Sequence, residues 1–166
     1  MQFEMIRPCN ASDFGTIYEI INDAAIAYRG VIPEQSVRDP YMGKSELSRE
    51  ILDGILFWGD EQGGELTGVM GLQEKADVTL IRHAYVRTRL QRRGVGANLL
   101  RHLELVAQNL ILIGTWANAT WAISFYQKRG YNLVSEKKKD ILLRKYWSVD
   151  DLQVQSSVVL AQNKLI

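Results

Sequence analysis

Three consecutive strand-like segments, joined by short turns, constrain the fold more than any other feature of the sequence. They are Ile55 to Gly59, Glu65 to Gln73 and Val78 to Val86, with Gly63 and Gly64 at the first turn. Connections this short join antiparallel neighbours, so the segments predict an antiparallel meander. A chain of 166 residues has room for one core, and no linker-like stretch divides it. We therefore expect residues 1–166 to form a single domain.

Helical patterns flank the meander. Ser12 or Asp13 can cap a first helix that ends near Tyr28 to Gly30, and Ser45 can cap a short second one. The apolar residues expected to face the core are Ile17, Ile20, Ile21 and Ala24 in the first helix and Leu47, Ile51 and Leu52 in the second. After the meander, helical spacing over Gly94 to Gln108 and an apolar run over Leu110 to Thr115 predict a right-handed crossover with parallel pairing of the strands.

The remaining segments complete the predicted architecture. Ala119 to Lys128 predicts a helix that ends at Gly130, and Glu136 to Trp147 predicts another. Further strands are expected at Phe3 to Arg7, Tyr131 to Val134 and Gln153 to Leu160. Together the segments predict an α+β fold, with helices packed on a mixed sheet of about seven strands.

Composition excludes several function classes. A formal charge of +1, with 46% hydrophobic and 23% charged residues, gives no overall attraction to nucleic acid or membrane, so we expect neither as a partner. Cys9 is the only cysteine, which rules out an internal disulfide framework or a thiolate zinc cage, and we expect no metal. The opening MQFEMIRP lacks the apolar core of a signal peptide, and no apolar run approaches the roughly 20 residues that span a bilayer. We therefore expect a cytoplasmic protein.

A basic loop with two glycines joins the end of the meander to the following helix. It covers residues 86–97 and contains Arg92, Arg93, Gly94 and Gly96. The first backbone N–H groups of a helix have no acceptor within it and carry about half a positive charge, so they can bind a pyrophosphate. Glycine lets a phosphate approach the backbone, and arginine adds charge-assisted contacts. The loop therefore indicates a phosphate site.

Two common phosphate motifs do not match this loop. A dinucleotide-binding fingerprint needs a third glycine near Leu99, and a Walker loop needs Gly-Lys-Ser/Thr where this chain has Gly94-Val95-Gly96. The segment Gln91-Arg92-Arg93-Gly94-Val95-Gly96 resembles instead the pyrophosphate motif Gln/Arg-x-x-Gly-x-Gly/Ala of the GNAT superfamily of acetyl-CoA-dependent N-acetyltransferases. Asn118 to Tyr131 is similar to that family's second signature, an Asn followed by a helix ending in Phe-Tyr-x-Lys-x-Gly-Phe/Tyr. The similarity in element order extends from Phe3 to Val134.

The resemblance implies an acyl-CoA N-acyltransferase fold of α/β/α layers, with helices on both faces of the sheet and a splayed pair of parallel strands that holds acetyl-CoA. It implies that the pantetheine arm pairs with the backbone of Ala84, Tyr85 and Val86 and contacts Asn118. The amides expected to meet the pyrophosphate are those of Gln91, Arg92, Arg93, Gly94, Val95, Gly96 and Ala97. Tyr126 would approach the thioester sulfur.

The chemistry of amine acetylation suggests further roles. An alkylamine with a pKa of about 10 is mostly ammonium at neutral pH, so a base must take a proton before the amine attacks. His83 and Glu74 are the candidates, and the family resemblance implies that ordered water alone can also serve. Without the position of a bulge, alternation does not settle which face His83 takes. A phenol can protonate the leaving thiolate, which suits Tyr126, and the Val86 N–H can meet an oxyanion.

The acceptor is expected to be a primary amine of a small molecule, amino acid or peptide. By analogy with the fold, the loop between the first two helices should bind it, and Tyr28, Arg29, Tyr41 and Met42 lie there. The aromatic and basic groups of this loop suit an acidic or apolar acceptor. The resemblance also suggests a homodimer formed through the late strand or the helix before it.

Two alternatives to catalysis stay open at this point. A non-catalytic acyl-CoA-binding sensor module would keep the phosphate loop but need no amine pocket. A nucleic-acid-binding domain would use Arg87, Arg89, Arg92 and Arg93 as phosphate contacts, and the near-neutral charge of the chain argues against it.

Overall fold

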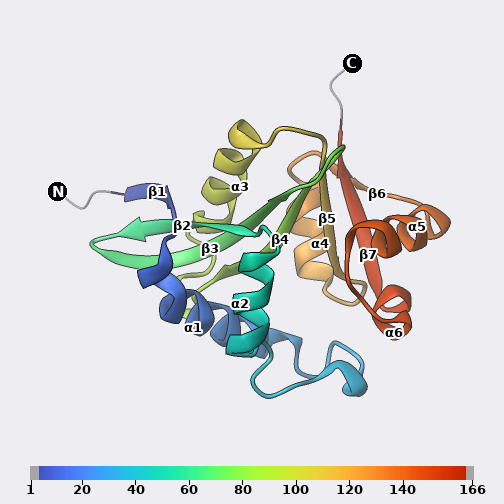
Figure 1. Ribbon diagram of the computed structural model, residues 1–166, viewed down its shortest axis with the longest axis horizontal. Coiled ribbons are helices and arrows are strands. Elements are labelled where there is room, and N and C mark those ends of the chain that lie inside the picture. Colours follow the sequence, from blue (N-terminus) through green and yellow to red (C-terminus); the bar gives the residue numbers. More distant parts are fainter. Residues whose placement is uncertain (1–3, 164–166) are drawn as a thin grey trace.

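The computed structural model of the protein describes residues 4–163, whose strands form one mixed sheet of seven strands (Figure 1). In chain order the strands are β1 (Glu4–Pro8), β2 (Leu56–Gln62), β3 (Glu65–Glu74), β4 (Thr79–Val86), β5 (Ile111–Trp116), β6 (Tyr131–Leu133) and β7 (Ser157–Gln162). Across the sheet they follow the order β1-β2-β3-β4-β5-β7-β6. Every neighbouring pair is antiparallel except β4 and β5, which are parallel. The predicted meander and parallel crossover are therefore confirmed.

Helices cover both faces of this sheet. One face carries α3 (Val95–Val106) and α4 (Thr120–Gln127), and the other carries α1 (Phe14–Ala24), α2 (Lys44–Leu52), α5 (Glu136–Tyr146) and α6 (Asp151–Gln155). Strand alternation explains the division. Ile111 and Ile113 of β5 belong to the apolar cluster of Leu99 on α3, whereas Leu112 between them belongs to that of Leu143 on α5. The layered α+β prediction is correct.

The buried face of α1 is confirmed, because the four predicted core residues Ile17, Ile20, Ile21 and Ala24 are all buried. The α-helix ends earlier than predicted, at Ala24, and the chain reaches Tyr28 as a 3-10 helix over Ala25–Tyr28. The prediction for α2 was partly wrong. Gly43, not Ser45, is its N-cap, and of the three residues expected to face the core only Leu47 is fully buried, whereas Leu52 is 86% exposed. A helix this short presents one narrow stripe to the sheet.

The last strand begins later than predicted. Residues 153–155 belong to α6, and β7 starts at Ser157. The Asp150 side chain explains the difference, because it accepts a hydrogen bond of 2.8 Å from the Gln153 amide and so caps a helical turn where alternation predicted a strand. At the other end, β1 begins at Glu4, and the predicted strand residue Phe3 lies outside the described residues.

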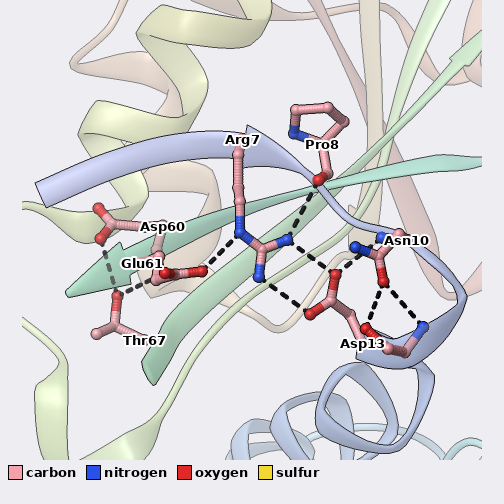
Figure 2. Close-up of polar contacts among 8 residues, drawn as sticks. Arg7, Pro8, Asn10, Asp13, Asp60, Glu61 and Thr67 are labelled. Carbon is pink, nitrogen blue, oxygen red and sulfur yellow. Dashed lines mark hydrogen bonds and ion pairs between the residues drawn. The ribbon is translucent and has the colours of Figure 1, made fainter. Parts of the chain in front are cut away.

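An ion-pair network ties β1 to the start of α1 and to β2 (Figure 2). The Arg7 guanidinium donates to both carboxylate oxygens of Asp13, at 2.8 and 3.1 Å, and to Glu61 on β2 at 2.6 Å. The Asp13 carboxylate also accepts from the Asn10 amide at 2.8 Å, which completes a capping box. The edge strand is thereby fixed to the first helix by side chains as well as by its backbone.

A β-bulge lies in β4 and decides which side chains reach the functional face. The β3–β4 register passes from Val69↔Tyr85 to Gly71↔Arg82, so β4 has one extra residue there, and His83 has a φ of 56°. In a regular strand Arg82 and His83 would point to opposite faces. Here both contact Glu50 of α2, so the bulge turns His83 to the face that carries Arg82.

The bulge makes Gly71 intolerant of a side chain. A Cβ at Gly71 would lie 2.6 Å from the Arg82 carbonyl oxygen and 2.8 Å from Ile55 Cγ2. We expect Gly71→Ala to lower the free energy of unfolding in urea by about 1–3 kcal/mol, since a backbone atom on a paired strand cannot easily yield. Gly15→Ala on α1 is the matched control: nothing lies within 4 Å of a Cβ added there, and about 0.5–1 kcal/mol of stabilisation is expected. Equal stability of the two variants would contradict this interpretation of the bulge.

Candidate active site

The parallel strands β4 and β5 separate part-way along their length. They pair only over Thr79–Ile81 and Ile111–Ile113, and neither residues 82–86 of β4 nor residues 114–116 of β5 pair with the other strand. β5 keeps its antiparallel partner β7 through Trp116, whereas the facing edge of β4 loses its strand partner. Backbone N–H and C=O groups on such an edge need other partners. The sheet therefore presents a splay at its centre, open to an extended ligand.

The Val86 amide points into this splay. The next amide, that of Arg87, donates to the Thr67 carbonyl at 2.9 Å and so faces β3. Successive amides of a strand point to opposite edges, which directs the Val86 N–H toward the open side. The Gln91 side chain donates to the Val86 carbonyl at 3.4 Å from the loop before α3. The open edge and the phosphate loop thus meet at Val86.

The loop before α3 has the backbone geometry of an anion site. Gly94 is the N-cap of α3, with a φ of 84°, and Arg92 also has a positive φ, of 62°. Nothing lies within 4 Å of a Cβ added to Gly94, so the space beside it is open. Val95 is buried, and a Cβ on Gly96 would lie 3.4 Å from the Phe125 ring, which anchors the first turn of α3 to α4. These residues fit a pyrophosphate at the helix N-terminus.

The four arginines of the loop divide into two pairs. Arg87 and Arg89 both pair with Glu65, and Arg87 also donates to the Leu66 carbonyl at 2.8 Å. Arg92 and Arg93 are exposed and have no ion pair within residues 4–163. Only the second pair is therefore available to a phosphate ligand without giving up an existing partner. This division disfavours a nucleic-acid surface that uses all four.

His83 and Arg82 share one carboxylate on the face of the splay. Glu50 accepts from His83 Nε2 through one oxygen and from Arg82 at 3.5 Å through the other. Burial alone would raise the pKa of Glu50, but the His83 hydrogen bond and the nearby positive charges outweigh it and lower the pKa below its ordinary value. The Glu50 carboxylate therefore stays ionised and can orient the His83 imidazole, an arrangement suited to a base.

Aromatic side chains line the face of the splay that carries His83. Tyr28 lies with its ring centroid 5.4 Å from that of Tyr41 and 6.3 Å from that of Tyr85, and the Trp116 indole donates to the Tyr41 hydroxyl at 3.1 Å. Burial is the main cause that raises the pKa of Tyr28 to about 12 and the pKa of Tyr41 and Tyr85 above the ordinary value. These hydroxyls stay protonated at neutral pH and act as neutral hydrogen-bonding groups.

Tyr126 and Asn118 lie on the β5–α4 side of the splay. Tyr126 is 5% exposed and belongs to the apolar cluster that contains Ile81 and Ile113, the last paired residues before the strands separate. Burial raises the pKa of Tyr126, with a smaller contribution from Tyr28, so the hydroxyl keeps its proton. The Asn118 side chain donates to the Val31 carbonyl at 3.3 Å and joins this side to the loop after α1.

The other predicted site residues are spread more widely. Arg29 is exposed and lines a neighbouring hollow formed by α1 and the loop between α1 and α2, which Tyr28 and Tyr41 also line, whereas Met42 is buried in the core. Glu74 lies at the end of β3 away from the splay, where its carboxylate accepts hydrogen bonds from Thr79 and from the Gln108 amide. The structure therefore brings His83, and not Glu74, to the splay.

Sequence reasoning did not identify Glu50, Arg82 or Trp147 as residues of this site. Glu50 lies 33 residues before His83, and nothing local to α2 marks it. Trp147 lines the splay because a Cβ on Gly114 of β5 would lie 3.2 Å from its ring, so glycine lets the indole rest on the strand. Gly114 was the one local signal for that contact.

Residues 4–163 contain no helix that is long and apolar enough to cross a membrane. Among the same described residues, no group of three or more His, Cys, Asp or Glu side chains is placed to hold a metal ion.

Comparison with known proteins defines the class. Residues 17–131 match the sequence model of the acetyltransferase (GNAT) family, which is more than half of the chain. The chain therefore belongs to the acetyltransferase (GNAT) family, and it is an acyltransferase by that membership. No curated protein sequence matches it.

Solved structures share its fold. PaiA N-acetyltransferase from Thermoplasma acidophilum, in complex with coenzyme A, is similar with a TM-score of 0.73 and 20% identity, over 97% of this chain and 99% of that one. A GNAT family acetyltransferase from Elizabethkingia anophelis with acetyl-CoA bound has a TM-score of 0.63 and 19% identity, over 96% and 97% of the two chains. The ribosomal-protein alanine N-acetyltransferase from Escherichia coli has a TM-score of 0.67 and 18% identity, over 96% and 93%.

Proposed function

We propose that this acetyltransferase transfers the acetyl group of acetyl-CoA to the primary amine of a small molecule, amino acid or peptide, by direct attack within a ternary complex. The observation that carries the proposal is the splay between β4 and β5, with a phosphate loop at one end and the His83–Glu50 pair on one face. The coenzyme A and acetyl-CoA found in solved structures of similar fold support this use of the splay.

The residues that would hold acetyl-CoA follow from the geometry. Amides from Gln91 to Ala97 at the start of α3, together with the exposed Arg92 and Arg93, would bind the pyrophosphate. The open edge of β4 from Ala84 to Val86 would pair with the pantetheine arm, and Asn118 would contact that arm from the opposite side. Acetyl-CoA supplies an acetyl group activated as a thioester.

His83 would act on the acceptor amine. The imidazole would take a proton from the ammonium form and so release the lone pair that attacks. Glu50 holds the ring in place, and burial of both side chains limits their contact with water, since His83 is 14% and Glu50 18% exposed. The group that removes the proton from the acceptor, the His83 imidazole, is therefore oriented before the acceptor binds.

Two groups would act at the other end of the reaction. The Val86 N–H, which faces the splay, would donate to the oxygen that becomes negative as the carbonyl is attacked. Tyr126 would give its proton to the leaving sulfur, and the raised pKa of this buried phenol keeps that proton available at neutral pH. Each role is assigned to one atom of this chain and can be tested separately.

Steady-state release of free coenzyme A from acetyl-CoA, measured across a panel of primary amines, tests the proposal. We expect release that depends on the amine, and Tyr126→Phe should lower kcat about 100-fold because the general acid is lost. Tyr131→Phe is the matched control, since its ring lies 6.0 Å from that of Tyr126 but its hydroxyl donates to Glu104.

Tight binding of acetyl-CoA without release for any amine would contradict transfer and favour an acyl-CoA sensor. Equal kcat in Tyr126→Phe and the native chain would remove Tyr126 from the mechanism without affecting the rest.

A further inference from the structure

A cavity opens on the face of the splay that carries the bulge. Arg82, His83 and Tyr85 of β4 line one side of it, and Gly114 and Trp116 of β5 line the other. Among the described residues that line this cavity, Arg82 and His83 are the groups able to carry a positive charge, and none is an aspartate or glutamate. The lining therefore favours a ligand with a negative group.

The Arg82 guanidinium has few partners for a buried charge. Its side chain is 17% exposed, and its contacts are long: 3.3 Å from Nη1 to the Gln73 side chain and 3.5 Å from Nη2 to Glu50. No hydrogen bond from Arg82 Nε is found within residues 4–163. A guanidinium has five N–H donors and binds carboxylates best through two parallel contacts. Arg82 thus keeps donors for one more acceptor.

Glu50 does not satisfy the remaining hydrogen-bond donors of Arg82, because His83 binds the same carboxylate. When His83 takes a proton, two cationic side chains share one anion, and a second carboxylate in the cavity would balance the charge. Glu46 and Asp53 also raise the pKa of Arg82 through their charge, but burial outweighs all three carboxylates and lowers it. The one carboxylate within hydrogen-bond reach of Arg82 is therefore shared with His83.

We propose that the acceptor is an α-amino acid whose free carboxylate binds Arg82 while its amine meets His83. Arg82 and His83 bind the two oxygens of one Glu50 carboxylate, so the two side chains end close together. An amine and a carboxylate on the same carbon match that short separation, whereas a peptide N-terminus lacks the carboxylate there. The rings of Tyr28, Tyr41 and Trp147 favour an apolar or aromatic side chain. The inference rests on the proposed function and narrows its acceptor.

Matched acceptors that differ only at the carboxylate test the inference. Phenylalanine, phenylalaninamide and phenethylamine form one set; leucine, leucinamide and isoamylamine form a second. We would measure kcat/KM for acetylation and, separately, the Kd of each compound by calorimetry in the presence of coenzyme A. The amino acid of a set should exceed its amide and amine about 10- to 100-fold in both quantities.

Substitutions of Arg82 test whether this residue causes the preference for acceptors with a free carboxylate. Arg82→Gln should remove the preference for the carboxylate, measured as the ratio of the value for each amino acid to the values for its own amide and amine, and Arg82→Lys should restore part of that ratio. Arg49→Gln, on an exposed position of α2, removes one arginine charge from the neighbouring helix and should leave the preference unchanged.

The outcomes separate the two proposals. Turnover of amines without preference for the carboxylate, or a preference that persists in Arg82→Gln, overturns the amino-acid inference while amine acetylation stands. If no compound is acetylated, binding decides: tighter binding of the amino acids that depends on Arg82 supports the inference and overturns the transfer reaction. Absence of both turnover and preferential binding overturns the two together.

Discussion

Glu50→Gln is expected to lower kcat about 100-fold while the fold is retained. The amide keeps the size of the carboxylate but not its charge, so the His83 ring loses the anion that orients it. Because Glu50 acts through His83, the split between kcat and KM is the informative measurement. kcat should fall while KM for the amine and the Kd of acetyl-CoA stay within a few-fold of the native values, since the variant disturbs the orientation of the base and removes no contact with either substrate.

Glu46→Gln is the control for this variant. Glu46 lies one turn earlier on α2 and pairs with Arg38, which is 63% exposed, at 3.3 Å. A surface pair of this kind contributes little, so kcat and KM should match those of the native chain. If Glu50→Gln keeps the native kcat, or loses kcat and acetyl-CoA binding together, the His83–Glu50 pair is structural and the base lies elsewhere.

Asp13→Asn is expected to cause the largest loss of stability, about 2–3 kcal/mol in the free energy of unfolding near neutral pH. The substitution removes the charge of the Asp13 carboxylate, which accepts two hydrogen bonds from Arg7 and one from the Asn10 amide (Figure 2). The Asp13 side chain is only 12% exposed, so water cannot easily replace these partners. Arg7 keeps its contact with Glu61, so β1 should stay paired. Urea unfolding measures the difference.

The same carboxyl predicts how stability depends on pH. The hydrogen bond from Arg7 lowers the pKa of Asp13, against the opposing effect of burial. A lowered pKa in the folded state means that the stabilisation is present above the unfolded-state pKa of about 3.9 and is lost as pH falls through the folded-state value. The gap between the native chain and Asp13→Asn should therefore narrow in acid.

Asp151→Asn provides the comparison, because its pair with Arg144 is exposed on both sides and should contribute less than about 1 kcal/mol. A gap between the native chain and Asp13→Asn that stays constant from neutral pH into acid would show that the network stabilises by shape and not by charge.

Local patterns accounted for most of the fold. Alternation and the Gly63-Gly64 turn located the meander, and helical spacing located the buried face of α1, because each pattern is determined within a few residues. Residues 150–160 show where local patterns fail to predict the structure. Val154, Ser156 and Val158 alternate as in a strand, yet the cap at Asp150 starts a helix there, so a local signal outweighed the pattern.

The candidate site was less accessible to sequence reasoning. The phosphate loop is contiguous and therefore visible as a motif, and its glycines have the open geometry that a phosphate needs. The position of His83 depends on a bulge, which changes the face of a side chain without any change in composition. Glu50 and Arg82 come together only through the tertiary contact between α2 and β4, and no local sequence pattern in either segment predicts that contact.

Transfer of an acetyl group from acetyl-CoA to an amine can be followed by mass spectrometry of the acceptor after incubation with acetyl-CoA that carries an isotope-labelled acetyl group. We predict the label on the amine nitrogen of an amino acid, with one free coenzyme A formed for each labelled product. Label that remains on coenzyme A, or appears only as free acetate at a rate independent of the amine, would contradict it.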